Sequence, residues 1–251
     1  MCIRDSQKLG RRVLQPLITA CLQRAVGVSV AAAALADRSP VLAAWRAKVA
    51  VVPFGIAAKP WLDVTASGDG PFLFVGRLVP YKGVDVLLDA LAQVPGAALE
   101  IVGEGPQESA LRQQVADLGL RERVRFVGTL DEAGIAARLA AARALVLPSV
   151  DASEAFGLVQ LEAMGAGVPV VVTELPTGVP EVGVPNETGL LVPPGDPEKL
   201  AAAIVRLLTD DALRELIVRK ARERVLKDFY NKDHICRLAE IYRREVPGLG
   251  V

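Results

Sequence analysis

Residues 72–92, FLFVGRLVPYKGVDVLLDALA, contain an apolar run, then a glycine turn, then a helical pattern. The first four residues are all apolar, as in a strand that is buried on both faces. After the turn, apolar residues recur at the i, i+3, i+4, i+7 spacing of one helix face: Val84, Leu87, Leu88 and Leu91. The stretch therefore predicts a strand followed by a helix that packs on the sheet.

The same alternation recurs along most of the chain. Short apolar runs rich in valine and leucine cover residues 26–32, 49–52, 72–75, 99–102, 124–127, 144–147, 168–172 and 190–192. Helical patterns lie between most of them, and one of these follows Asp196 as a predicted N-cap and Pro197 at the first helical position. Strands and helices that alternate over short connections predict an α/β fold, a parallel sheet with helices on both faces.

A segment rich in Pro, Gly, Ser and Asp divides the chain. Residues 57–70, AAKPWLDVTASGDG, have the composition of a linker. Residues 71–228 then contain the strands and helices of a complete domain. Residues 1–56 hold only two strand runs, too few for an autonomous domain of about 100–150 residues, so they predict a partial second domain. Residues 229–251 predict a C-terminal helix that crosses back towards the first segment.

Charge and cysteine content argue against several classes of protein. The 29 basic residues balance 29 acidic ones, and because nucleic-acid binders carry a basic surface, we expect no nucleic-acid partner. Cys2, Cys21 and Cys236 are odd in number and far apart, which with no signal peptide indicates reduced thiols in a cytoplasmic protein. The uncharged residues 25–36 are about half as long as the roughly 20 residues of a transmembrane helix.

The chemistry is expected in four loops that follow strands, because open α/β sheets bind ligands at the carboxyl ends of their strands. In the first loop, Gly76 lets the backbone turn after the strand, and Arg77 and Lys82 flank the turn. A guanidinium and an ammonium group suit a diphosphate. The alternative is two solvated surface cations.

The second and third loops carry weaker signals. Residues 103–106, GEGP, begin like a dinucleotide fingerprint, but Glu108 stands at the third glycine position, so the fingerprint fails. Gly105 then indicates either a plain tight turn or a turn that lets a nucleotide base approach the backbone. Gly128 ends another strand run and belongs to the same series of loops.

The fourth loop is the most informative one. Residues 153–171, SEAFGLVQLEAMGAGVPVV, predict a loop that runs into a helix near Gly157 or Leu158. Glu154 precedes that helix and Glu162 lies within it, so the two carboxylates can contact different parts of one ligand. Free N–H groups at the helix start suit a phosphate. The alternative is that Glu154 only complements the helix dipole and Glu162 faces solvent.

Several motifs of the chain occur together in one known family. They are VGRL at 75–78, KG at 82–83, SEAFG at 153–157, EAMGAGVPVV at 162–171 and ETGLLVPPGD at 187–196. Within them, Glu154 and Glu162 form an E-x7-E motif. From about residue 12 to 245 the chain resembles glycosyltransferase family 4, which has the GT-B fold with Rossmann-like domains. Residues 51–56, VVPFGI, resemble the junction between the family's two domains.

The resemblance implies roles for the residues of the first and fourth loops. Arg77 and Lys82 would hold the diphosphate of a nucleotide sugar and stabilise the leaving group as its charge develops. Glu154 would contact hydroxyl groups of the donor sugar. The predicted catalytic residues are therefore Arg77, Lys82 and Glu154.

The resemblance also implies how the rest of the donor is bound. Glu162 would bind the ribose, and the turns near Gly105 and Gly128 would frame the base. Backbone N–H groups at residues 156–158 would lie near sugar and phosphate. The predicted donor-binding residues are Gly76, Gly105, Gly128, Phe156, Gly157, Leu158 and Glu162.

A member of this family would transfer a sugar with retention at the anomeric carbon, without a metal ion or another cofactor. We expect a hexose carried on UDP or GDP. The acceptor stays open between a glycan, a lipid-linked molecule and a small molecule, and peripheral membrane association of the full-length protein is compatible with the family. The sole histidine, His234, is interpreted as structural or solvent-facing.

The chain also departs from the family. The acceptor of a GT-B enzyme binds in a cleft between two domains, and the opening glycine-rich loop, early strands and histidine of the first domain have no counterpart here. We therefore interpret residues 1–56 as the remnant of an acceptor-side domain, and residues 71–228 as the donor-binding domain. On this interpretation the chain is a truncated form, and we expect little or no transfer by it alone.

The same residues are compatible with other functions to different degrees. Paired carboxylates also occur in glycosidases, but these enzymes do not need the cationic first loop. A dehydrogenase is disfavoured by the failed fingerprint. A nucleotide-binding module without turnover stays open, and so does a sugar-nucleotide epimerase of related fold, which would release an epimerised donor without any acceptor.

Overall fold

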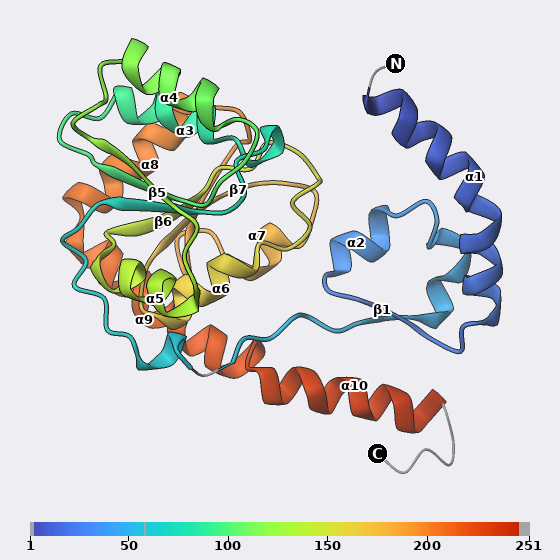
Figure 1. Ribbon diagram of the computed structural model, residues 1–251. Coiled ribbons are helices and arrows are strands. Elements are labelled where there is room, and N and C mark those ends of the chain that lie inside the picture. Colours follow the sequence, from blue (N-terminus) through green and yellow to red (C-terminus); the bar gives the residue numbers. More distant parts are fainter. Residues whose placement is uncertain (1–2, 58, 246–251) are drawn as a thin grey trace. The chain divides into compact units, whose positions relative to one another are not determined.

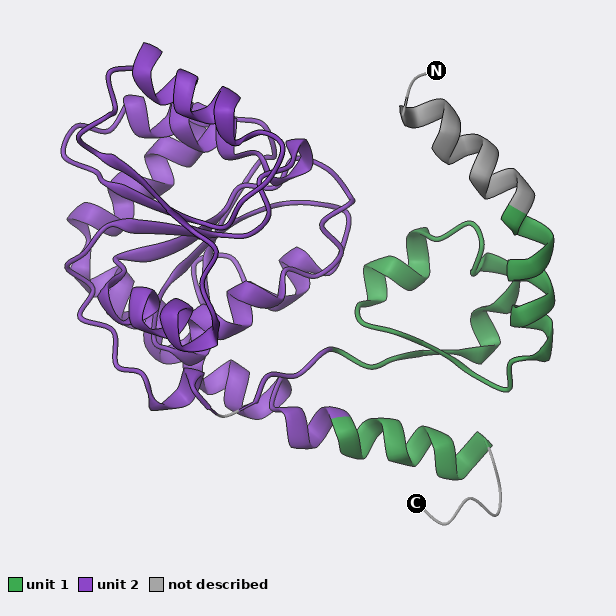
Figure 2. Ribbon diagram, viewed as in Figure 1, with its two compact units in different colours: residues 1–53, 235–251 green, residues 54–234 purple. Residues whose placement is uncertain are grey.

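The computed structural model describes residues 3–57 and 59–245, of which residues 3–13 are described by their backbone alone. These residues form two compact units (Figures 1 and 2). Unit 1 lies within Met1–Pro53 and Ile235–Val251, and unit 2 is Phe54–His234. The predicted site residues all belong to unit 2.

Unit 2 is built on a parallel sheet. In its described part, six strands follow the order β5-β4-β3-β6-β7-β8, and every neighbouring pair is parallel. Their bounds are β3 (Phe72–Val75), β4 (Leu99–Val102), β5 (Val124–Gly128), β6 (Ala144–Leu147), β7 (Val170–Thr173) and β8 (Leu190–Val192). The strand order reverses between β3 and β6, which is the point where doubly wound sheets bind their ligands.

Helices cover both faces of this sheet. In Figure 1, α3, α4 and α8 lie on one face and α5, α6 and α9 on the other. The bounds are α3 (Val84–Ala92), α4 (Glu108–Asp117), α5 (Glu132–Ala141), α6 (Leu158–Gly165), the short α7 (Val179–Val182), α8 (Pro197–Thr209) and α9 (Asp211–Asp228). Asp196 caps α8 by accepting the N–H of Lys199 at 2.9 Å, with Pro197 at the first helical position. The predicted α/β fold with helices on both faces is confirmed.

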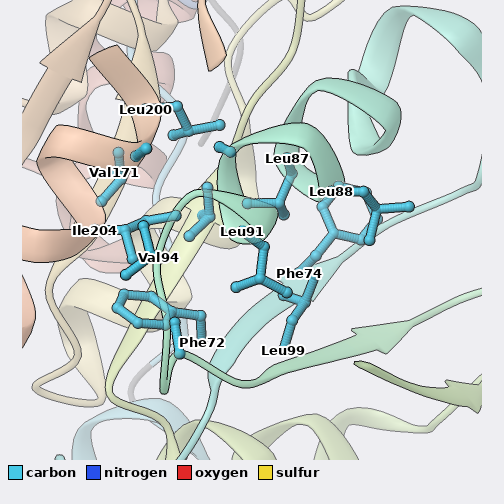
Figure 3. Close-up of a cluster of buried hydrophobic side chains, with 14 of the residues drawn as sticks. Phe72, Phe74, Leu87, Leu88, Leu91, Val94, Leu99, Val171, Leu200 and Ile204 are labelled. Carbon is cyan, nitrogen blue, oxygen red and sulfur yellow. The ribbon is translucent and has the colours of Figure 1, made fainter. Parts of the chain in front are cut away.

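The core of unit 2 follows from the apolar patterns. Alternate side chains of a strand share one face, so Phe72 and Phe74 of β3 lie together against α3 (Figure 3). The predicted apolar face of α3 is fully buried there: Val84, Leu87, Leu88 and Leu91. Each buried leucine contributes about 1.5–3 kcal/mol relative to an exposed one. This packing fixes the first site loop, which connects β3 to α3.

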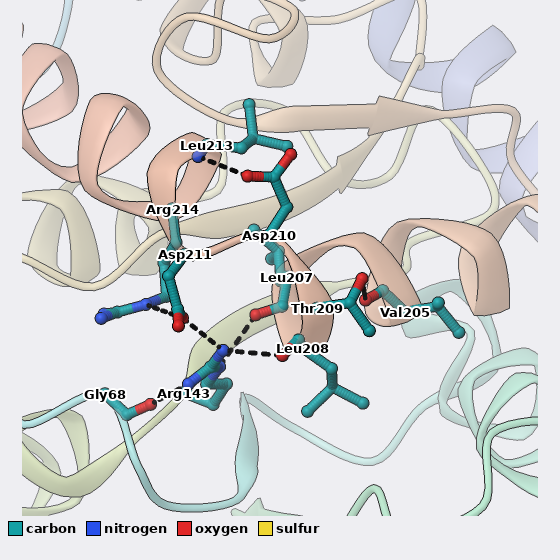
Figure 4. A network of polar contacts seen from close by, with 10 residues as sticks. All are labelled: Gly68, Arg143, Val205, Leu207, Leu208, Thr209, Asp210, Asp211, Leu213 and Arg214. Carbon is teal, nitrogen blue, oxygen red and sulfur yellow. Dashed lines mark hydrogen bonds and ion pairs between the residues drawn. The ribbon is translucent and has the colours of Figure 1, made fainter.

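Residues 57–70, predicted as a linker, lie within unit 2 and pack on it. Trp61, in the short helix η2 (Trp61–Asp63), is only 5% exposed. Arg143 donates to the carbonyl of Gly68 and to the last carbonyls of α8, and it pairs with Asp211 (Figure 4). Proline, glycine, serine and aspartate thus mark irregular backbone here, not a free connection, and the unit boundary falls at 53/54.

Unit 1 contains a pair of parallel strands among its described residues, β1 (Val28–Val30) and β2 (Val49–Val51), with Val28 opposite Val49. Its helices are α1 (Ile3–Arg24), α2 (Ala33–Arg38), the 3-10 helix η1 (Ala43–Lys48) and the part of α10 (Asn231–Glu245) that begins at Ile235. Lys48 Nζ caps the end of α1 by donating to the carbonyl of Ala25 at 2.8 Å and to that of Gln23 at 3.1 Å.

Two further findings concern membranes and thiols. No helix among the described residues is long and apolar enough to cross a membrane. Cys21 and Cys236 are exposed free thiols, whereas Cys2 lies outside the described residues. The end of the predicted C-terminal helix, residues 246–251, also lies outside them.

Candidate functional site

The loops after β3 and β6 flank the point where the strand order reverses, and their side chains meet. Lys82 Nζ donates to Glu154 Oε2 at 2.6 Å. The two side chains are only 12% and 9% exposed. Two of the predicted catalytic residues, 72 positions apart in the sequence, therefore form one nearly buried ion pair at the carboxyl edge of the sheet.

Glu154 is held by a second donor. Ser149 Oγ donates to the same Oε2 atom at 2.9 Å, and the carbonyl of Ser149 accepts the hydroxyl of Thr173 at 2.6 Å. Ser149 and Thr173 are both buried. A buried charge is tolerated only when it is paired and hydrogen-bonded, and these contacts meet that requirement for the Glu154 carboxylate.

Gly83 lets the two loops come this close. Its φ is +65°, and a Cβ atom there would lie 2.2 Å from the carbonyl oxygen of Pro148. Next to it, the N–H of Val150 donates to the carbonyl of Tyr81 at 2.8 Å. Lys82 ends the short helix η3 (Pro80–Lys82) directly before this glycine, so its side chain is delivered to Glu154 by the same turn.

The first three predicted loops line one groove. The N–H groups of Gly76 and Leu78 donate to the carbonyls of Val102 and Glu104, both at 2.9 Å, and Gly103 N–H donates to the carbonyl of Gly128 at 2.8 Å. These bonds hold the ends of β3, β4 and β5 together around a groove of about 380 Å³. It is lined by Val75, Gly76, Arg77, Val102, Gly103, Glu104, Thr129, Leu130 and Ile135.

Arg77 lies on the rim of this groove. Its side chain is exposed and forms no ion pair within the described part of the chain. Lys82 lies nearby, because its Nζ would be 3.6 Å from a Cβ atom on Gly76, another lining residue. The groove, Arg77 and the Lys82–Glu154 pair therefore form one continuous site at the edge of the sheet.

Gly105 and Gly128 do not line the groove themselves. A Cβ atom on Gly105 would lie 2.3 Å from the carbonyl oxygen of Leu78, so this glycine permits close packing of the second loop on the first. Besides Val75, Val102 and Gly103 at the strand ends, the lining residues missing from the predicted site are Glu104, Thr129, Leu130 and Ile135. They stand beside or shortly after the predicted glycines, but nothing in the sequence tells which of them faces the groove.

The fourth loop ends at α6 as predicted. Gly157, with φ +69°, is the N-cap of α6, and Leu158 is the first helical residue. Phe156 is only 4% exposed, whereas Leu158 is 45% exposed. The first N–H groups of a helix have no partner within it, so those at the start of α6 can bind an anion beside the Lys82–Glu154 pair.

Glu162 is half-buried on α6, one turn beyond this start. Burial, followed by the charge of Glu132, raises its pKa from 4.5 to about 7. Glu132 is the first residue of α5, directly after the loop that contributes Thr129 and Leu130 to the groove. Glu162 is not among the residues that line the groove, and no described residue forms an ion pair with it.

The raised pKa predicts that stability falls as the pH rises. A carboxyl with a folded pKa above its unfolded value stabilises the fold below pH 4.5, and this contribution is lost as the pH rises to about 7. We expect Glu162→Gln to be more stable than the wild type at pH 8 by about 2 kcal/mol, after allowance for partial exposure, and equally stable at pH 4.5. Urea denaturation at both pH values measures this difference. An equal effect at both would contradict it, and Glu132→Gln should reproduce only a minor part.

Among the described residues, no group of three or more His, Cys, Asp or Glu side chains is placed to hold a metal ion. His234 lies near Phe54, with ring centroids 6.2 Å apart.

The part of the chain that forms this site is similar to known proteins. A family model described as glycosyl transferases group 1 matches residues 64–224, which include every predicted site residue. The D-rhamnosyltransferase WbpZ of Pseudomonas aeruginosa is 35% identical over 207 residues, 79% of this chain and 54% of that protein. The glycogen synthase of Mycobacterium tuberculosis is 36% identical over 203 residues, 78% and 48%. The chain thus spans about half the length of these curated relatives.

Two solved structures have a fold similar to that of this chain. A sucrose-phosphate synthase from Thermosynechococcus elongatus matches 93% of this chain and 61% of its own, with a TM-score of 0.80 and 32% identity. Anabaena HepE in complex with UDP matches 90% of this chain and 66% of its own, with a TM-score of 0.81 and 25% identity.

Proposed function

This chain belongs to the glycosyl transferases group 1 family, and from that membership we propose that the protein transfers a sugar from a nucleoside diphosphate to an acceptor. The observation that carries the proposal is the nearly buried Lys82–Glu154 pair beside the groove, at the point where the strand order reverses. The Lys82 ammonium group, the Glu154 carboxylate and the free N–H groups at the start of α6 lie together, and these groups can bind the diphosphate and the sugar hydroxyls of a nucleotide sugar.

The donor is assigned to these groups by chemistry. The diphosphate binds between Arg77 and Lys82, whose positive charges stabilise the leaving group as its negative charge develops. Glu154 accepts hydrogen bonds from the donor sugar. The base occupies the groove against Leu130 and Ile135, and Glu162 accepts hydrogen bonds from the ribose.

The proposal extends to the stereochemistry of transfer, the donor, the acceptor and the location. We assign the chain to glycosyltransferase family 4, with retention at the anomeric carbon, a hexose donor on UDP or GDP, and no metal ion or other cofactor. HepE, whose structures contain UDP and UDP-glucose, supports a uridine donor. The acceptor is a glycan, a lipid-linked molecule or a small molecule. The proposed location is cytoplasmic, and a lipid-linked acceptor would call for peripheral membrane association of the protein.

Thermal unfolding tests the donor site. The chain is heated with UDP, GDP, ADP, TDP or NAD, each with and without magnesium. A ligand at about 100 times its Kd adds about 2.7 kcal/mol of stability, and each kcal/mol raises the Tm by about 2–4 °C. We expect one nucleoside diphosphate to raise the Tm with or without magnesium. If none of them moves a cooperative transition, the donor site is refuted.

Arg77→Ala should weaken diphosphate binding without lowering the stability of the unliganded chain. The side chain is exposed, so its loss removes little packing, whereas a hydrogen bond to a charged group is worth about 1.5–3 kcal/mol, or about ten- to a hundredfold in Kd. Isothermal titration with the diphosphate that stabilises the wild type measures this. Arg121→Ala, an exposed arginine that precedes β5, should leave the Kd unchanged, and an equal loss in both variants would argue against a specific role.

Nucleotide binding without transfer is the second candidate. It is favoured by one observation, namely that the groove and the Lys82–Glu154 pair are complete within unit 2. Donor-dependent product formation by the purified protein separates transfer from binding. Release of a free epimerised sugar nucleotide without any acceptor would indicate an epimerase instead.

A further inference from the structure

An aromatic cluster lies behind the fourth site loop. The ring of Phe156, inside that loop, contacts Phe54 edge-to-face, with centroids 5.3 Å apart and planes at 89°. It also contacts Phe229, with centroids 6.3 Å apart and planes at 68°. Phe54 is the first residue of unit 2, and Phe229 follows the last turn of α9. The cluster therefore joins the site loop to the segments where the chain enters and leaves unit 2.

Phe54 is held in place by the backbone beside it. The N–H of Ile56 donates to the carbonyl of Phe229, and the N–H of Asn231 donates to the carbonyl of Ile56, both at 2.9 Å. Gly55 permits this approach, because a Cβ atom there would lie 2.8 Å from Asn231 Cα. The entering and leaving segments are thus paired directly, and Phe54 extends from this pair.

The other side of Phe156 is also fixed. The fully buried Gln160 donates to the carbonyl of Phe156 at 2.7 Å, and the N–H of Gly178 donates to the carbonyl of Ala155 at 2.8 Å. These bonds hold the backbone of the loop, while the buried ring packs against Phe54 and Phe229 in the aromatic cluster. Glu154 lies two residues before Phe156, and the N–H groups at the start of α6 follow it directly.

We propose that Phe54 is a positioning residue, which fixes the Phe156 ring and through it the loop that presents Glu154 and the start of α6 to the donor sugar. Phe54 is 43% exposed, so burial in the hydrophobic core does not explain why an aromatic side chain occupies this position. An edge-to-face contact does, since its energy depends on the mutual orientation of two rings. The inference rests on the proposed donor site, and it assigns the sugar-binding end of that site to contacts made at the boundary of unit 2.

Two measurements on Phe54→Ala, Phe54→Tyr and Leu226→Ala test the proposal. The first is the ratio of the affinities for a sugar nucleotide and its diphosphate, with UDP-glucose and UDP or GDP-mannose and GDP, whichever pair stabilises the wild type. The second is hydrogen exchange of the amides in residues 154–160, which needs no ligand. Phe54→Tyr keeps the ring, and Leu226→Ala removes a similarly exposed apolar side chain of α9, 50% exposed.

In Phe54→Ala we expect sugar-nucleotide affinity to fall about tenfold more than diphosphate affinity, with faster exchange in the loop. A general loss of structure would lower both affinities together. Phe54→Tyr should restore the ratio and Leu226→Ala should keep it. An unchanged ratio or unchanged exchange in Phe54→Ala overturns the proposal, as does the same effect in Leu226→Ala. If the wild type binds no nucleotide, the proposed function fails, and exchange alone decides the role of Phe54.

Discussion

Lys82→Met is expected to lower the free energy of unfolding by about 3–5 kcal/mol and to abolish measurable binding of the diphosphate. The substitution keeps most of the side-chain volume but leaves the Glu154 carboxylate, 9% exposed, with the Ser149 hydroxyl as its remaining side-chain donor among the described residues. The loss of stability therefore comes from an uncompensated buried charge. The loss of binding comes from the missing cation. Urea denaturation and isothermal titration measure the two effects separately.

A double variant separates these two causes. Lys82→Met combined with Glu154→Gln removes both charges, so most of the lost stability should return, because a neutral amide needs no counter-ion. Binding of the diphosphate should not return. If the two substitutions instead lower stability additively, the pair contributes nothing as a pair, and the geometry of the site would need another explanation. Glu154→Gln alone should leave the Lys82 ammonium unpaired and lower stability as well.

Much of this fold follows from the sequence because of how parallel sheets are buried. The inner strands of unit 2 lie between two layers of helices, so their residues are nearly all apolar. The runs at 72–75, 99–102, 144–147 and 190–192 coincide with strands to the residue. In the same way, the apolar face of α3 and the cap of α8 are local features, which depend on residues a few positions apart.

The site is predictable only in part, for a related reason. Strand ends in a parallel sheet share one edge, so Arg77, Lys82 and Glu154 could be expected near each other. That Lys82 and Glu154 form a buried pair depends on a contact across 72 residues, which no local pattern encodes. The same holds for the aromatic contact between Phe54 and Phe156.

The error about residues 57–70 has a different origin. Their composition reports the absence of regular structure, but packing depends on what lies beside them. Trp61 is the one large aromatic residue in that segment, and it is buried in unit 2. A tryptophan side chain buries about 150–250 Å², so its size alone indicates that this part of the segment packs on the domain. For Glu162, the sequence places the residue in its helix, while the desolvation that raises its pKa arises from neighbouring elements.

Gly83→Ala should lower the free energy of unfolding by about 3 kcal/mol and weaken diphosphate binding. An alanine at φ +65° costs about 1–2 kcal/mol for its backbone conformation alone. The rest arises because the new Cβ, 2.2 Å from the Pro148 carbonyl oxygen and 2.9 Å from Val150 Cγ1, must push the two site loops apart. Lys82 precedes this glycine, so the displacement also lengthens its contact with Glu154.

Gly96→Ala is the matched control. Gly96 has φ +83°, in the same left-handed region, but no atom lies within 4 Å of the position its Cβ would take. This variant should therefore show the backbone cost of about 1–2 kcal/mol and unchanged nucleotide binding. Chemical denaturation measures the free energy of unfolding of both variants. The difference between their losses of stability is the contribution of the contact between the two site loops. If Gly83→Ala and Gly96→Ala lose the same stability, the loops after β3 and β6 can separate freely, and Gly83 does not set the distance between Lys82 and Glu154.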